Sequence, residues 1–534
     1  MRCCSAFSCI SSSPNCWAYF CPAACFTGCS ADFKEVFPML ALFGQGLMQA
    51  ATPLNIMYIA FGVIWGIIGG AIPGISASVA MSLLLPLTFG MNPAHSLPML
   101  AAVYVGAEYG GSIPAILIKT PGTGAAAATV LDGYEMQRKG LGGKALCISL
   151  YAGVLGGLVS VVILVFSTLP LARFALKFGP SQYFWMAMMG LSIVGAVSGK
   201  DSMKGIISAA FGLFLAIIGM DKFTSTQRFT FGVFRLSEGL DLIPVLVGLF
   251  ALSEVFRQIF SGEIFEVIRD KIKMTYPTKK ELASVTPIVL ACGAMGSVVG
   301  ALPGAGATIA SWIGYSETKM FCKNNETFGT GDIRGVAAPE SANNGVPAGG
   351  LIPLLALGIP GSNSTAILMV GFSLAGISCG PMLFINQPAV PYGLMASMFV
   401  AQIVLLFVGL MMLRPCVYIT SIKKIYLTSA IMLFAFIGAF STTNDIYSVI
   451  LVLVFGLIGF AMKELGFAPA ATVLGFVLGE LVEGNLRRTM QMSRGSMDIF
   501  FAGGLNKFFI ALTVLGVLFP YISKWISSRR KAAA

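Results

Sequence analysis

Four Pro-Gly dipeptides stand at matching places in two halves of this sequence, and each could serve chemistry at a helix end. Each dipeptide closes one of four segments that match in pairs and in the same order: Gly66–Gly74 with Gly296–Gly304, and Gly110–Gly122 with Gly349–Gly361. Proline removes a backbone donor and glycine loosens the chain, so each dipeptide predicts an interrupted helix. The matched order indicates an internal duplication.

A helix that starts after such an interruption presents unpaired N–H groups and a partial positive charge, which together attract an anion. Hydroxyl and amide side chains follow the dipeptides, where they could cap the new helix, contact substrate oxygens, or do both. Alternatively, the four sites are kinks that only let helices bend and pack. We favour a binding site for a carboxylate, and the residues expected to line it are Gly74, Ser76, Ser112, Gly122, Thr123, Gly304, Thr308, Gly361, Ser362 and Asn363.

Two acidic residues within apolar segments are candidates for coupling to a cation or a proton, since ionisable groups inside a membrane are expensive and usually functional. Glu108 lies two residues before a Gly-Gly motif, and Glu340 is followed by Asn343 and Asn344. Carboxylate and amide oxygens suit a hard cation such as Na⁺. Two alternatives stay open: Glu108 is a structural partner of Lys119, or the Glu340 cluster is a capped helix N-terminus.

Enzyme chemistry is disfavoured, because the chain has one histidine, His95, and no pair or spacing of residues for zinc or nucleophilic catalysis. We expect no cofactor and no metal beyond Na⁺ as a coupling ion. A phosphate loop of the form G-x-x-x-x-G-K-[ST] is also missing, which disfavours a primary pump. Asp132 and Glu135 lie beside Arg138 and Lys139, and we interpret this segment as a solvated loop.

These candidate residues must be positioned by membrane helices. The 534 residues are 56% hydrophobic and 11% charged, too little charge for a soluble fold of this size. No Asp, Glu, Lys or Arg occurs from Val36 to Ala107 or from Ser341 to Leu413. Such long apolar blocks predict an all-α bundle of about 12 segments, with two or three interrupted ones too short to cross as plain helices.

The net charge of +11 does not indicate nucleic acid, because the basic residues cluster in short loops between apolar blocks. This positive-inside pattern places the central loop and the C-terminal tail in the cytoplasm. We divide the chain into a first transmembrane repeat at 39–270, a cytoplasmic linker at 271–283 and a second repeat at 284–534. The Cys-rich segment 1–38 is interpreted as an extension arising from an upstream mis-start, or as a real, modified extension. Whether the repeats are parallel or inverted is left open.

Two further stretches of sequence carry a family resemblance. Tyr109–Thr123, which reads YGGSIPAILIKTPGT, and Phe328–Asn344, which reads FGTGDIRGVAAPESANN, strongly resemble the large membrane subunit of the tripartite tricarboxylate transporter family. The likeness extends from about Met39 to the C-terminus. One departure is Lys119, where we expect the family to favour Asn, and a basic side chain there could reach a substrate carboxylate or join an accessory charge pair.

The resemblance implies a permease of the bacterial cytoplasmic (inner) membrane that takes up citrate or related organic acids by symport, driven by a Na⁺ or H⁺ gradient. It also implies two protein partners, a small membrane subunit and a periplasmic binding protein that delivers the substrate. The alternatives are a permease for another small solute, energised by a separate ATPase chain, a membrane-embedded enzyme, and a passive channel.

Overall fold

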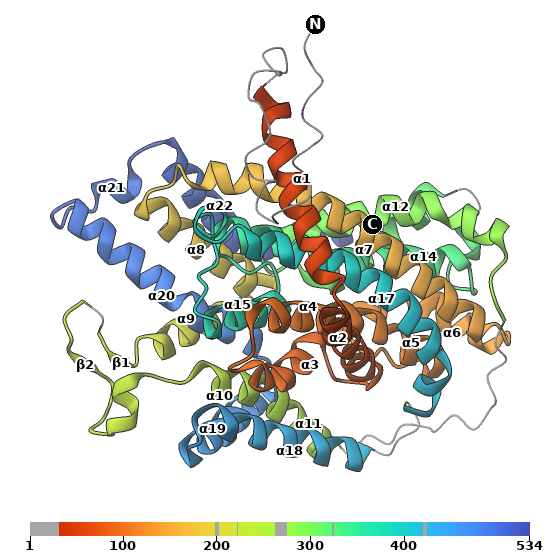
Figure 1. The fold of residues 1–534 in the computed structure, drawn as a ribbon, viewed down its shortest axis with the longest axis horizontal. Helices are drawn as coiled ribbons and strands as arrows, with labels where there is room; N and C mark the ends of the chain where they lie inside the picture. The colour runs from red at the N-terminus through yellow and green to blue at the C-terminus, as the bar shows by residue number, and fades with distance from the viewer. Residues whose placement is uncertain are drawn as a thin grey trace, which may run out of the picture.

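The structure is a computed structural model that describes residues 31–197, 202–221, 223–261, 275–322, 325–419 and 424–533. It is an almost entirely helical bundle (Figure 1). The strands of the described residues are β1 (Gly219–Met220) and β2 (Gln227–Arg228), which pair antiparallel. The predicted all-α class is therefore confirmed.

The described residues of the first half form eleven α-helices. They are α1 (Ala31–Ala50), α2 (Pro53–Ala71), α3 (Ala77–Leu84), α4 (Pro93–Gly110), α5 (Ser112–Ile118), α6 (Val130–Arg138), α7 (Gly142–Ala175), α8 (Pro180–Val197), α9 (Ser202–Ala216), α10 (Leu242–Val247) and α11 (Ser253–Ser261). Gly111 itself is helical, so α5 continues α4.

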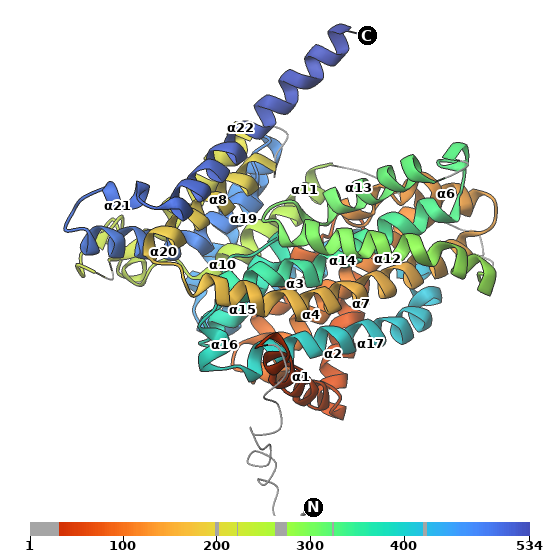
Figure 2. The same cartoon turned by 90° about the horizontal axis from the view of Figure 1, so that it is seen from above.

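The second half contains the remaining helices, and Figure 2 shows the last of them extending away from the bundle. They are α12 (Lys279–Ala301), α13 (Gly306–Phe321), α14 (Ile333–Leu357), α15 (Asn363–Leu374), α16 (Leu383–Asn386), α17 (Ala389–Ile419), α18 (Lys424–Thr443), α19 (Ile446–Glu464), α20 (Pro469–Met492), α21 (Asp498–Phe501) and α22 (Gly504–Ala533).

Seven helices of the described residues are long and apolar enough to cross a membrane. Five further apolar stretches are shorter, and they lie in α3, α9, α15, α18 and α22. Together they match the predicted total of about twelve segments. The stretches in α3 and α15 are short for the expected reason, because each of these helices starts directly after a Pro-Gly dipeptide.

The duplication is visible in how helices pack, because glycines lie against a neighbouring backbone at equivalent positions of both halves. These contacts pair glycine with a carbonyl oxygen of the neighbouring helix: Gly66 with Val103, Gly70 with Ala107, Gly296 with Ala342, and Gly300 with Val346. A Cβ at any of these glycines would collide with the opposing backbone. The α2–α4 pair of the first half is therefore repeated as the α12–α14 pair of the second.

The two repeats are inverted relative to each other. Contacts of α14 and its flanking segments with the first repeat run in opposite sequence order. They join Asp332 with Asp132, Glu340 with Thr129, Asn343 with Glu108, and Ser362 with Tyr104. The equivalent long helices α7 and α17 also run antiparallel, because Gly157 lies against Gln402 and Gly409 lies against Leu150. Both observations indicate inverted repeats, a relation that the sequence alone left open.

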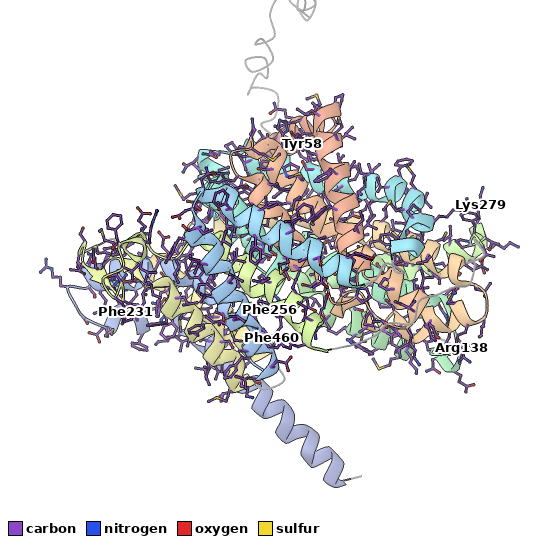
Figure 3. The ribbon with its side chains drawn as sticks, turned by 90° about the horizontal axis from the view of Figure 1, so that it is seen from below. Tyr58, Arg138, Phe231, Phe256, Lys279 and Phe460 are labelled. Carbon is purple, nitrogen blue, oxygen red and sulfur yellow. The ribbon has the colours of Figure 1, made fainter. Side chains whose placement is uncertain are left out.

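Two of the loops that carry basic residues, before α7 and before α12, meet at one end of the molecule. The Lys144 ammonium lies 2.8 Å from a Glu281 carboxylate oxygen and so joins the start of α7 to the start of α12. Figure 3 shows Arg138 and Lys279 at this end and Phe231 at the other. The cytoplasmic placement of the central loop and of the C-terminal tail stays a prediction.

The predicted domain boundaries stay predictions. Helix α12 already begins at Lys279, where Thr278 and Glu281 form a capping box, so the end of the predicted linker 271–283 is helical. Residues 271–274 of the linker and residues 1–30 of the Cys-rich extension lie outside the described residues.

Candidate functional site

The two Pro-Gly interruptions of each repeat meet through a backbone hydrogen bond. The Gly74 N–H donates to the Gly122 carbonyl at 3.3 Å, and the Gly304 N–H donates to the Gly361 carbonyl at 3.1 Å. Both donor glycines have positive φ, 90° and 83°, a conformation that a residue with a Cβ rarely adopts. The dipeptides therefore form the same paired turn in both repeats.

The acceptor glycines, Gly122 and Gly361, also have no room for a side chain, because each packs directly against backbone atoms of a neighbouring segment. A Cβ at Gly122 would overlap the carbonyl oxygen of Gly70, and a Cβ at Gly361 would lie 2.5 Å from the carbonyl oxygen of Gly300. These neighbours are again equivalent in the two repeats, so close backbone approach is the physical reason for glycine here.

New helices start after the interruptions, as predicted. The Ser76 hydroxyl caps α3 by accepting the Val79 N–H at 3.4 Å. The Ser362 hydroxyl caps α15 by accepting the Thr365 N–H at 3.2 Å. Helix α13 follows Gly304, and a short 3₁₀ turn, η3 (Gly124–Ala127), follows Gly122. Both serines thus take the capping role that the sequence offered as one alternative.

The interruptions of the two repeats lie near one another. The Tyr104 hydroxyl of α4 is 3.0 Å from the Ser362 hydroxyl after the second repeat's last interruption. A Cβ at Gly124 would lie 3.1 Å from the hydroxyl oxygen of Thr308, which follows the other interruption of the second repeat. Thr308 and Asn363 are exposed, whereas Thr123 is buried.

Two residues of the predicted substrate set lie apart from the paired turns. Ser112 is fully buried, where its hydroxyl donates to the Tyr109 carbonyl and contacts the Ser149 hydroxyl at 2.7 Å. Lys119 is exposed, with its ammonium 5.6 Å from the centre of the Tyr134 ring. The predicted substrate contacts of these and the other residues of the set stay predictions.

Glu340 is a fully buried carboxyl held by hydroxyl groups. Its two oxygens accept the Thr129 hydroxyl at 2.5 Å and the Ser149 hydroxyl at 3.1 Å. Helix α14 begins at Ile333, so Glu340 lies inside the helix and the alternative of a capped N-terminus is wrong. Asn344, one helical turn further along, donates its Nδ2 to the Glu340 carbonyl at 3.0 Å.

Glu108 is buried on α4, 5% exposed, and its Oε2 atom has no hydrogen-bond partner among the described residues. Its backbone carbonyl accepts the Asn343 Nδ2 at 3.1 Å. The alternative of a Glu108–Lys119 pair is not met, because Lys119 follows the end of α5 some three helical turns away and contacts Tyr134 instead. Neither Glu108 nor Glu340 forms an ion pair within the described residues, although an unpaired charge is costly to bury.

Sequence reasoning missed two residues near this site. Tyr104 could have been found by aligning the repeats, because it stands at the position equivalent to the polar Asn343. Asp132 was predicted to be solvated, but it is fully buried and accepts the backbone N–H groups of Gly329, Gly331 and Asp332 at 2.8–2.9 Å. That correction has a simple cause, since the partners lie some 200 residues away in sequence.

The first paired turn also lies against a charged cluster that the sequence did not single out. A Cβ at Gly74 would lie 2.9 Å from a carboxylate oxygen of Glu254. Glu254 forms ion pairs with Arg257 and Lys463, both at 2.9 Å. Arg257 thus belongs to a charged cluster beside the turn.

A cavity of about 320 Å³ lies elsewhere, among the ends of α1, α2, α4 and α17. Its polar lining includes Gln49, Asn55, Asn92 and Ser397, and it includes no residue of the predicted substrate or cation set. Asn55 also binds His95, whose Nδ1 is 2.5 Å from the Asn55 Oδ1 atom. The lone histidine thus makes a structural contact from the first turn of α4.

Comparison with known proteins agrees with this architecture. The model of the tripartite tricarboxylate transporter TctA family matches residues 56–474. An uncharacterized 52.8 kDa protein in the TAR-I ttuC' 3' region of Agrobacterium vitis is 37% identical over 493 residues, which are 92% of this chain and 98% of that protein. A second Agrobacterium vitis protein, in the TAR-II ttuC' 3' region, is 38% identical over 234 residues, which are 44% of this chain and 97% of that protein. The chain is therefore a multi-pass membrane protein that belongs to the tripartite tricarboxylate transporter TctA family.

Proposed function

We propose that the protein takes up carboxylate anions, such as citrate or a related organic acid, by secondary active transport coupled to a Na⁺ or H⁺ gradient. Membership of a tricarboxylate transporter family supports the substrate class. The coupling ion and the particular acid are proposals from the site.

The observation that carries the proposal is the pair of matched turns, Gly74–Gly122 and Gly304–Gly361. Helix starts gathered at such turns offer N–H groups and positive helix ends, which suit a carboxylate. Interrupted helices from inverted repeats that meet near one another are typical of secondary transporters. We infer that the substrate carboxylates bind between the two turns, next to Ser76, Thr308 and Asn363.

Coupling is supported by the buried acids. Since Glu108 and Glu340 have no basic partner among the described residues, each needs a proton or a metal cation when it is buried. Binding of that positive charge together with the anion reduces the net charge that must cross the membrane. We therefore expect the proton or cation to be transported together with the acid.

The tripartite family name supports two further proposals about partners. A small membrane subunit would assemble with this chain, and a periplasmic binding protein would deliver the acid to the face opposite the basic loops. The transporter would then act in the cytoplasmic membrane.

Reconstitution tests the proposal directly. The chain, its small subunit and its binding protein are placed in liposomes without ATP, a Na⁺ or pH gradient is imposed, and uptake of labelled citrate and dicarboxylates is followed. We expect accumulation that stops when the gradients are collapsed. Uptake that persists without either gradient, or that requires ATP, would overturn the proposal.

A further inference from the structure

Because the repeats are inverted, we expect two equivalent side-chain contacts between the halves, here called crossings. Among the described residues, only one of the two crossings is hydrogen-bonded. Tyr104 lies six residues before Gly110, as Asn343 lies six before Gly349, so the two are equivalent. Thr123 and Ser362 each follow the glycine of a Pro-Gly dipeptide and are equivalent too. The Tyr104–Ser362 contact of 3.0 Å therefore has a counterpart between Asn343 and Thr123.

The counterpart crossing is not hydrogen-bonded. The Thr123 hydroxyl oxygen and the Asn343 Oδ1 atom are both buried, and neither has a partner among the described residues. Asparagine is much shorter than tyrosine, so Asn343 cannot span the distance that Tyr104 spans. Its Nδ2 atom donates instead to the Glu108 carbonyl. The second crossing thus leaves two unsatisfied oxygens, on residues that contact Glu108 and Gly111.

A third unsatisfied oxygen belongs to the same turn of α4. Thr123 packs against Gly111, one turn beyond Glu108, and a Cβ at Gly111 would collide with the Thr123 side chain. Glu108 also carries the carbonyl that Asn343 binds, and its own Oε2 atom is buried without a partner among the described residues. Three buried oxygens of different chemistry, a hydroxyl, an amide and a carboxylate, therefore belong to residues that meet at one helical turn.

We propose that Thr123, Asn343 and Glu108 form a Na⁺ site. Space for the ion exists at this crossing because the short Asn343 stands where the equivalent crossing has Tyr104. Hydroxyl, amide and carboxylate oxygens are the ligands of a hard cation, and the carboxylate neutralises its charge. This site deepens the proposed function, on which it rests, because it assigns the coupling ion and its ligands. Glu340 differs, since hydroxyl groups already donate to both of its oxygens.

The tyrosine crossing explains why one site is expected rather than two. Tyr104 and Ser362 satisfy each other, and Ser362 also caps α15. Pro347 stands at the position equivalent to Glu108, so the second repeat also lacks the carboxylate. The tyrosine crossing therefore offers neither space for a cation nor a carboxylate to neutralise its charge.

Sodium binding to the purified full chain tests the site without substrate, partners or transport. The probe is ²²Na⁺, with choline as the replacement ion, and the variants are Thr123→Val and Glu108→Gln. The matched control is Ser311→Ala, which removes another buried, unpartnered hydroxyl from a helix of the same bundle. We expect saturable binding by the wild type and by Ser311→Ala, and binding weakened tenfold or more in both site variants. Size-exclusion profiles and melting temperatures in choline show that each variant is folded.

The possible results separate this inference from the proposed function. Wild-type affinity for Na⁺ in folded Thr123→Val and Glu108→Gln would overturn the site, as would absence of Na⁺ binding by the wild type. Either result leaves carboxylate uptake driven by H⁺ intact. Loss of Na⁺ binding in both variants together with normal uptake driven by a Na⁺ gradient would support the site but remove it from coupling.

Discussion

Lys119 and Gly358 end equivalent helices of the two repeats in the same left-handed conformation, with φ of 59° and 74°. Gly358 adopts this conformation without strain, whereas the Cβ of Lys119 meets neighbouring backbone atoms at a cost of about 1 kcal/mol. Contact of the Lys119 ammonium with the Tyr134 ring offsets a part of that cost. The end of α5 at Lys119 is therefore less stable than the equivalent end of α14 at Gly358.

Replacing Lys119 with glycine should stabilise the protein. The variant Lys119→Gly removes the Cβ and restores the residue found at the equivalent position, so we expect a higher melting temperature and a gain of at most about 1 kcal/mol. Lys119→Ala, which keeps the Cβ and loses the contact with Tyr134, should melt below the wild type. Thermal unfolding of the purified chain measures both, and a lower melting temperature for Lys119→Gly would refute the argument.

Adding a single methyl group at either acceptor glycine should abolish uptake. Gly122→Ala and Gly361→Ala place a Cβ against the carbonyl oxygens of Gly70 and Gly300, and the paired turns must separate. We expect uptake by proteoliposomes to fall at least tenfold while the chain still inserts in the membrane. Gly484→Ala is the matched control, because its Cβ would meet no atom within 4 Å. Normal uptake by both turn variants would show that the turns do not form the site.

The turns could be predicted from sequence because their cause is local. Proline and glycine limit the backbone at their own positions, so Pro73-Gly74 and its three counterparts mark helix interruptions whatever surrounds them. The all-α class is equally local in origin, since long uncharged blocks need no knowledge of their neighbours. The inversion of the repeats is not local, because it depends on which end of α14 lies beside α4.

The site was harder to predict because contacts between distant segments decide it. Asp132 reads as solvated from its neighbours Arg138 and Lys139, yet its partners come from the loop before α14. From its place beside Pro121-Gly122, Lys119 is predicted to contact substrate or to join a charge pair, whereas its position over Tyr134 comes from the left-handed end of α5. In both cases a side chain's direction depends on tertiary contacts that sequence spacing does not contain.

Asp132 joins the two repeats, so its removal should destabilise the chain. One of its oxygens accepts three backbone N–H groups from the loop before α14, and the other accepts the Tyr315 hydroxyl at 3.0 Å. Asp132→Ala leaves these buried donors unpaired, and we expect a loss of about 3 kcal/mol or more. Asp132→Asn keeps an acceptor oxygen and should lose less. Thermal unfolding measures the order of the two variants, and equal stability would contradict this role.

Acid should loosen the hairpin that contains β1 and β2. The backbone N–H of Phe223, with smaller contributions from Thr224 and Arg487, lowers the pKa of Asp221 from 3.8 to about 2. Because this pKa is lower in the folded chain, ionised Asp221 stabilises the hairpin above pH about 4, and the contribution is lost as the pH falls toward 2.

Cleavage by pepsin, followed between pH 4 and pH 2, reports this loosening of the hairpin. We expect cleavage within residues 219–239 to rise over this interval beyond the change in pepsin activity on an unfolded substrate. Asp221→Asn should be cleaved readily throughout, whereas Asp498→Asn, at an exposed position, should match the wild type. A wild-type hairpin cut equally fast at both pH values would contradict the assigned role of Asp221.

Glu340→Gln should separate coupling from substrate binding. The amide keeps an acceptor for the Thr129 or Ser149 hydroxyl but can no longer take up a proton or neutralise a cation. We therefore expect gradient-driven accumulation of labelled acid to fall at least tenfold, while exchange of external for internal acid continues in the same proteoliposomes. Glu317→Gln, at an exposed position on α13, is the control and should accumulate acid normally. Accumulation by Glu340→Gln at the wild-type rate would show that this carboxyl is structural, because a group required for coupling cannot be neutralised without uncoupling the acid from the gradient.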